Sequence, residues 1–206
     1  MLEAVCKFTA RGQGRIAKPI TWHAGTAGSA WLSITLRVVA SSDVTTIRAA
    51  EPSDAAGIAA IYNHYVEHSI VTFEEEQVSD AEMARRLEDV RSESLPWLIA
   101  EEAGRVVGFA SSRKWKSRSA YRFSAEITVY VEPGRARRGI GSKLYARLFP
   151  ILQARGIHAV LGGIALPNEA SVALHEKFGM RRVAHFAEVG FKFDRWIDVA
   201  YWQRTL

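Results

Sequence analysis

Residues 125–142 read AEITVYVEPGRARRGIGS, and this stretch carries the strongest structural signal in the chain. Its first seven residues alternate between apolar and other side chains, which is typical of a strand and places Glu126, Thr128 and Tyr130 on one face. The glycine turn at 139–142 then opens a helix. Glycines there let backbone N–H groups close on a ligand, and a helix N-terminus is a site for phosphate oxygens. The stretch therefore predicts a strand, a glycine turn and an anion-binding helix start.

Two nucleotide-binding motifs fail when they are compared with this turn letter by letter. A dinucleotide fingerprint has a third glycine where this chain has Leu144. A Walker loop has Lys and then Ser or Thr where the chain has Ile140 and Gly141. Because a Gly-x-Gly before a helix is also common as a close-packed turn, the turn alone leaves its ligand open.

Outward from this stretch, helix-like and strand-like segments alternate over residues 44–206, which predicts one α/β domain. The predicted strands are 44–48, 97–101, 106–111, 125–131, 158–164, 182–193 and 198–203. Four helices are predicted. The first two begin at the expected N-caps Ser53 and Ser79, and the other two span 141–155 and 168–178. Pro150 falls inside the third helix, and we expect it to kink or shorten that helix.

The composition is that of a globular protein: 206 residues, 48% hydrophobic and 24% charged. The net charge is +5, but residues 1–42 hold five basic residues and one acidic residue, leaving 22 basic and 21 acidic residues elsewhere. We expect residues 1–43 to be a basic, poorly ordered extension, with a transit peptide as the minor alternative, and 44–206 to be the folded domain. Because that domain is nearly neutral, we expect no nucleic acid as a partner.

The single cysteine, Cys6, excludes an intrachain disulfide and fits a reducing compartment, so we expect a cytoplasmic protein. It also leaves residues 44–206 without a thiol nucleophile. Apolar runs are too short to span a bilayer, so we expect no membrane partner. Residues 64–68 match the H-x-x-E-H zinc pattern and 111–114 match S-x-x-K, but neither has its companion residues, and we expect no metal.

The glycine turn resembles the pyrophosphate-binding signature Gln/Arg-x-x-Gly-x-Gly/Ala of the GNAT acyltransferase superfamily. Gly139 and Gly141 match it, and Ala136 at the Gln/Arg position is the one departure. Further motifs, in order between residues 47 and 203, resemble the phosphinothricin and methionine sulfoximine/sulfone acetyltransferases within that superfamily. They are Asn63-His64-Tyr65, Trp97–Glu101, Trp115–Tyr121, Ala125–Val131, Leu166-Pro167-Asn168, Gly190-Phe191-Lys192 and Trp202-Gln203. The resemblance implies the GNAT fold: an α/β, mostly antiparallel sheet with flanking helices, splayed at its fourth and fifth strands, where we expect a bulge.

The resemblance also implies an N-acetyltransferase that uses acetyl-CoA as cosubstrate and transfers the acetyl group directly to an α-amino group. Glu126 is the expected general base and His175 the expected general acid. The alternative for Glu126 is a structural carboxylate paired with a nearby arginine. The alternative for His175 is a structural helix histidine. The residues expected at the cofactor are Val129, Tyr130, Val131, Arg137, Arg138, Gly139, Ile140, Gly141, Ser142 and Asn168, with the Val129 N–H facing the thioester oxygen.

For the acceptor, the resemblance implies a small amino acid of the phosphinothricin or methionine sulfoximine type. Lys116 and Arg118 would face its anionic groups, and the rest of the expected pocket comprises Phe73, Tyr121, Thr128 and Tyr130. A homodimer is also expected from the resemblance. Two alternatives stay open at this stage, namely an acetyltransferase for another amine or a protein N-terminus, and an acyl-CoA-binding module without catalysis.

Overall fold

The computed structural model describes residues 44–206, so the expected N-terminal extension lies outside the described residues. One seven-stranded sheet forms the centre, in the order β1-β2-β3-β4-β5-β7-β6. Its strands are β1 (Thr46–Ala49), β2 (Trp97–Glu102), β3 (Arg105–Lys114), β4 (Ser124–Val131), β5 (Ala159–Leu166), β6 (Arg181–Lys192) and β7 (Arg195–Thr205). All neighbouring pairs are antiparallel except β4 and β5, which run parallel. The predicted mixed, mostly antiparallel sheet is confirmed.

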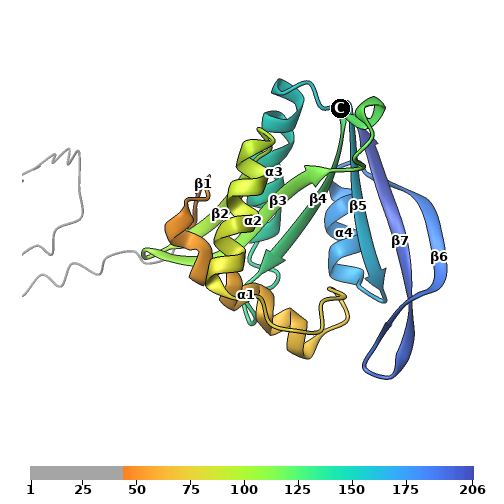
Figure 1. The fold of residues 1–206 in the computed structure, drawn as a ribbon, viewed down its shortest axis with the longest axis horizontal. Coiled ribbons are helices and arrows are strands. Elements are labelled where there is room, and N and C mark those ends of the chain that lie inside the picture. The colour runs from red at the N-terminus through yellow and green to blue at the C-terminus, as the bar shows by residue number, and fades with distance from the viewer. Residues whose placement is uncertain (1–43) are drawn as a thin grey trace, which may run out of the picture. The chain divides into compact units, whose positions relative to one another are not determined.

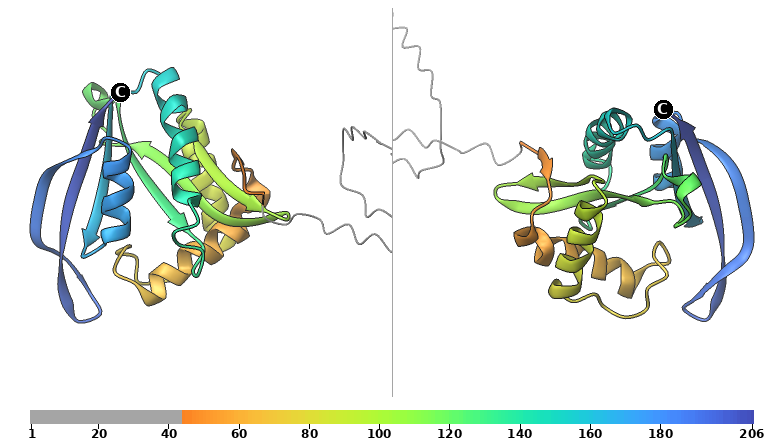
Figure 2. Two further views of the ribbon diagram at one scale, coloured as in Figure 1. Left: turned by 180° about the vertical axis from the view of Figure 1, so that it is seen from behind. Right: turned by 45° about the horizontal axis from the view of Figure 1, so that its top comes forward.

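Within residues 44–206, four α-helices cover the sheet, two on each face (Figure 2). They are α1 (Ala55–His68), α2 (Asp80–Ser92), α3 (Ile140–Ala154) and α4 (Glu169–Lys177). The larger core cluster lies under α3 and includes the fully buried Leu144, Leu148 and Leu152. The second cluster joins α1 and α2 to β2 and β3 on the opposite face. The two clusters hold the sheet from both sides, which positions the ends of its strands.

β4 and β5 are paired over three residues only. Their register runs from Ser124 opposite Ala159 to Glu126 opposite Leu161, and beyond Glu126 the two strands separate (Figure 1). The predicted splay is therefore confirmed. The expected bulge is wrong, because β4 pairs with β3 from end to end without a register shift. β5 likewise pairs with β7 from end to end without a register shift, so the gap lies between two regular strands.

One of the two predicted helix caps is confirmed and the other is wrong. Ser79 caps α2 by accepting a hydrogen bond from the N–H three residues later (3.1 Å). Ser53 caps nothing, because the short 3₁₀ turn Pro52–Asp54 precedes α1. Asp54 stabilises that turn by accepting from the Glu51 N–H (2.8 Å), and it forms an ion pair with Arg48 (2.7 Å).

α3 continues through Pro150 to Ala154, so the predicted shortening is wrong. Proline at this position removes the hydrogen bond to the carbonyl of Ala146. Pro150 and Ala146 both lie on the exposed side of α3, where water can hydrate that carbonyl. The opposite side buries an apolar stripe that holds the helix on the sheet.

Candidate active site

Backbone groups of β4 line the gap on one side. Gly108 lies opposite Val131 in the β3–β4 register. The N–H of Glu132, the residue after Val131, donates to the carbonyl of Val107, the residue before Gly108 (2.9 Å). In an antiparallel ladder this bond marks Val131 and Gly108 as a non-hydrogen-bonded pair. The N–H and C=O groups of such a pair point away from the partner strand, and the pattern recurs at every second residue. Val129 and Val131 therefore direct their backbone N–H groups toward the gap.

The glycine turn delivers the N-terminus of α3 to the same end of β4. Gly139 adopts a left-handed conformation (φ 78°), and no side chain caps the helix. Arg135 anchors the turn by pairing with Glu132 (2.6 Å) and with Glu102. Arg137 and Arg138 are exposed beside the first helical turn. An uncapped helix start with two nearby arginines suits a phosphate group, so these residues fit the pyrophosphate of a CoA molecule.

α4 approaches the first turn of α3 closely. A side chain at Gly141 would place its Cβ 3.0 Å from the Leu174 side chain, so Leu174 would have to shift to admit any larger residue. Lys177 donates to the Ser142 hydroxyl (3.0 Å), which adds a third cation to the region that the sequence analysis did not identify. Asn168 caps α4 by accepting from the Ser171 N–H (3.1 Å), as its place at the helix start predicts.

Glu126 lies at the point where β4 and β5 separate, and its side chain is 9% exposed. Its carboxylate pairs with Arg113, which lies opposite it on β3 (2.6 Å between Nη2 and Oε2). The pairing proposed as the alternative for Glu126 is thus present. Arg113 is 67% exposed, so solvent reaches the pair. The pKa of the Tyr201 hydroxyl is raised, first by burial and next by the negative charge of Glu126.

Tyr130, one of the expected cofactor residues, is directed away from the gap in this structure. The Tyr130 ring packs against Phe109 and Tyr62 (5.2 Å between ring centroids in each case), and its backbone, by the alternation in β4, faces β3. Tyr130 therefore belongs to the aromatic cluster beneath α1, and not to the gap. The Val131 carbonyl accepts a hydrogen bond from the Tyr65 hydroxyl (2.6 Å). Of the two backbone groups of Val131, the N–H is therefore the one left to bind a ligand in the gap.

His175 is buried, and both of its ring nitrogens have partners. Nδ1 lies 2.7 Å from the Ser171 carbonyl oxygen, and Nε2 lies 3.1 Å from the Tyr145 hydroxyl. The ring also fills the space beside Gly162, where a Cβ would be 2.5 Å from Nε2. These contacts between α3, α4 and β5 support the structural alternative for His175 over the general-acid role.

The residues expected around the acceptor lie in two separate places. Phe73, in the α1–α2 connection at the bottom of Figure 1, packs against Gly190 of β6. Lys116 lies over the Trp115 ring (4.6 Å), in the β3–β4 connection at the top of the same view. Arg118 and Tyr121 are exposed in that second connection, whereas Thr128 lies on β4 and bonds Ser111 (2.8 Å). Phe73 thus lies in a different connection from Lys116, Arg118 and Tyr121.

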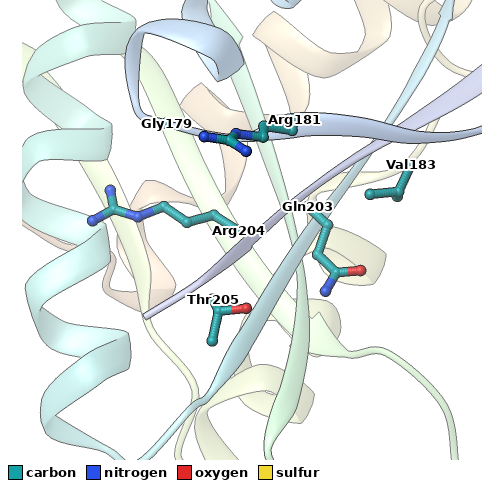
Figure 3. A pocket seen from close by; sticks show the side chains of 6 residues that line it. All are labelled: Gly179, Arg181, Val183, Gln203, Arg204 and Thr205. Carbon is teal, nitrogen blue, oxygen red and sulfur yellow. The ribbon is translucent and has the colours of Figure 1, made fainter.

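Residues 44–206 form cavities on the β5–β7–β6 side of the sheet. One, of about 370 Å³, is lined by Gly179, Arg181, Val183, Gln203, Arg204 and Thr205, and it contains none of the predicted site residues (Figure 3). The other, of about 610 Å³, lies at the start of α4 and is lined by Asn168, Glu169, Trp196 and Asp198 among others. Asn168 is the expected cofactor residue among those that line this second cavity.

The zinc pattern does not form a metal site in the described part of the chain. The rings of His64 and His68 stack at 4.8 Å, and His68 Nδ1 lies 3.0 Å from the His64 carbonyl oxygen. Residues 44–206 contain no group of three side chains suited to hold a metal ion. Within the same residues, no helix is both long enough and apolar enough to cross a membrane.

A sheet that parts between two parallel strands, with an uncapped glycine turn at the end of the first, defines an acyl-CoA N-acyltransferase fold. The family described as "Acetyltransferase (GNAT) domain" matches residues 47–201, and the chain belongs to it. The protein is thus a GNAT N-acetyltransferase.

Curated relatives place the chain near two enzyme groups. It is 39% identical to phosphinothricin N-acetyltransferase of Streptomyces coelicolor, over 78% of this chain and 95% of that protein. It is 36% identical to the L-methionine sulfoximine/L-methionine sulfone acetyltransferase of Salmonella typhimurium, over 78% and 94%. The solved structure of yncA from Salmonella typhimurium with its cofactor acetyl-CoA superposes with a TM-score of 0.77 at 36% identity, covering 79% of this chain and 94% of that one.

We predict that His175 makes stability depend on pH. Burial lowers the pKa of His175 below its ordinary 6.5, against the opposing hydrogen bond to Ser171. The unfolded chain therefore takes up this proton at a higher pH than the folded chain, so stability is full above about pH 6.5 and falls as the pH drops. Urea midpoints between about pH 5 and 8 should show a smaller slope for His175→Gln than for the wild type. Equal slopes would remove His175 from this effect.

Proposed function

We propose that the protein transfers the acetyl group of acetyl-CoA to the α-amino group of a small amino acid of the phosphinothricin or methionine sulfoximine type. The observation that carries this proposal is the gap beyond Glu126, into which the Val129 and Val131 N–H groups point. The gap joins the N-terminus of α3 to a nearly buried carboxylate. The names of the relatives at 36–39% identity give amino acids of this kind as their substrates, which supports the acceptor class.

Acetyl-CoA would supply the acetyl group as a thioester: an N–C bond forms as the C–S bond breaks, and the CoA sulfur leaves as a thiolate that takes up a proton from solvent. The first turn of α3, with Arg137, Arg138 and Lys177, would hold the phosphates. The Val129 N–H would donate to the thioester oxygen as negative charge develops there. Glu126 would accept the proton that the acceptor amine loses. Because residues 44–206 contain no cysteine, we propose direct transfer without an acyl-cysteine.

The acceptor's carboxylate and phosphinate or sulfone oxygens need cationic partners. Lys116 and Arg118 are exposed cations on the β3–β4 connection, which ends at the strand that carries Glu126. Arg113 is a further candidate that the sequence analysis missed, because only the β3–β4 register reveals that it lies beside Glu126. An exposed guanidinium can exchange one carboxylate partner for another, so an acceptor carboxylate can compete with Glu126 for it.

We also propose a homodimer. β6 is the edge strand of the sheet, and it and the adjoining hairpin expose a series of large apolar side chains. They are Val183, Phe186, Val189, Phe191, Phe193 and Trp196, each about half exposed or more. Sedimentation equilibrium of the full chain should give twice the 22.9 kDa monomer mass, because a patch of this kind is stabilised by burial against a second copy. A mass of 22.9 kDa at micromolar concentration would contradict the dimer.

Acceptor specificity is tested by following thiol release from acetyl-CoA. Phosphinothricin, methionine sulfoximine and methionine sulfone should each give turnover at about 1 mM, because each combines a free α-amino group with two oxygen-bearing groups. A polyamine should be a poor acceptor, since it would be repelled by Lys116 and Arg118. Turnover with the polyamine and with none of the three amino acids would overturn the acceptor class.

Glu126→Gln should lower kcat/KM by about a hundredfold or more, because the amide keeps the shape of the side chain but cannot accept the proton. The affinity for CoA, measured by calorimetry, should stay within about twofold, since the phosphates bind at α3. Glu88→Gln is the matched control, because Glu88 is an exposed glutamate on α2. Unchanged turnover in Glu126→Gln would remove Glu126 from the mechanism.

A further inference from the structure

The last residue of β6, Lys192, is 2% exposed although its side chain carries an ammonium group. The ammonium donates to three backbone carbonyl oxygens: Val66 (2.6 Å), Thr72 (3.0 Å) and Glu74 (2.9 Å). An ammonium has three N–H donors, so its donor capacity is met entirely by these carbonyls. Val66 lies in the last turn of α1, where carbonyls lack helical partners and the helix dipole favours a cation. The buried charge is thus compensated by backbone oxygens of one short region.

Two of these carbonyls, those of Thr72 and Glu74, belong to the α1–α2 connection, residues 69–79, and β6 holds this connection at a second point. Phe73 packs directly on Gly190, where an added Cβ would lie 2.4 Å from two ring carbons. Gly190 and Lys192 are two residues apart on the same strand and so face the same side of it. Two independent contacts therefore attach the connection to the end of β6.

The other side of the same connection is tied to β4. The Tyr62 hydroxyl lies 2.6 Å from the Thr72 hydroxyl and 3.0 Å from a Glu74 carboxylate oxygen, and Arg86 pairs with that carboxylate (2.8 Å). The Tyr62 ring in turn meets Tyr130 of β4 edge-on (5.2 Å). The connection thus spans from β6 to β4 at the end of the sheet where β4 and β5 are apart (Figure 1).

A buried lysine is a costly way to hold a loop if stability is its only role, since an apolar side chain avoids the desolvation of the charge. An ammonium with three carbonyl acceptors differs from an apolar contact because its directional hydrogen bonds fix where those carbonyls lie. We propose that Lys192 is a positioning residue for the acceptor. By attaching residues 69–79 to β6, it sets the width of the opening on the acceptor side of the gap. The inference rests on the proposed function, in which the CoA phosphates bind at α3, and it adds that the acceptor's amino group reaches the gap beside residues 69–79.

The test is Lys192→Met, which keeps the length of the side chain and removes the ammonium. We expect the KM for the amino-acid acceptor to rise at least about tenfold, because a displaced wall misplaces the bound acceptor. We expect the affinity for CoA, measured by calorimetry, to change less than about twofold. Amide hydrogen exchange should become faster within residues 69–79, because their carbonyls lose a shared donor.

Two further variants separate positioning from stability. Gly190→Ala leaves the ammonium in place but displaces Phe73, and it should give the same rise in acceptor KM; it carries the test if Lys192→Met does not fold. Leu152→Ala creates a cavity under α3, and it should lower Tm without changing acceptor KM.

If Lys192→Met and Gly190→Ala both lower Tm and leave the acceptor KM unchanged, the proposal is overturned. Faster exchange throughout residues 44–206 in Lys192→Met would also contradict it, since a positioning contact acts locally. The proposed function can fail separately: a wild-type protein that binds CoA but acetylates none of the amino acids refutes the acceptor class. The exchange experiment on residues 69–79 needs no acceptor, and under that outcome it still decides whether Lys192 fastens the connection.

Discussion

The end of the β4–β5 pairing at Glu126 is the constraint on which the rest of the site depends. Up to that residue, parallel hydrogen bonds satisfy the backbone of β4 on the β5 side. Beyond it, the N–H groups of Val129 and Val131 face a gap and lack a strand partner. A strand that leaves backbone groups unpaired in this way creates a binding surface whose geometry is set by the sheet, while α3 supplies an uncapped helix start at the same end.

In this domain the role of a charged side chain depends on where it lies, and the net charge does not predict that role. Residues 43–206 hold 22 basic and 21 acidic residues, yet a few cations occupy decisive positions. Arg113 lies against Glu126 at the separation point, and Lys177 reaches the first turn of α3. Lys192 is buried on three carbonyls. Each cation meets a different acceptor, namely a carboxylate, a hydroxyl and a set of backbone oxygens, so exposed and buried charges have different roles.

Prediction from the sequence succeeded where the signal was local. The alternation in 125–131, the cap at Ser79 and the glycine turn before α3 depend on neighbouring residues, and the structure confirms them. It failed where distant groups competed for a residue. Asp54, which pairs with Arg48, ends up as the residue before α1 in place of Ser53. The aromatic cluster beneath α1 takes the ring of Tyr130, and no pattern within residues 125–142 reports that cluster, while the expected place of Tyr130 at the cofactor stays a prediction.

The sequence by itself determined the α/β class, the strand that carries Glu126 and the helix start that suits a phosphate, because periodicity and glycine positions encode local geometry. The tertiary structure decided which side chains meet. It brought Arg113 to Glu126 through the β3–β4 register, gave His175 a partner at each nitrogen, and placed Lys192 on carbonyls more than a hundred residues earlier in the chain. Such contacts depend on strand register and helix packing, which arise only when the whole domain buries its core.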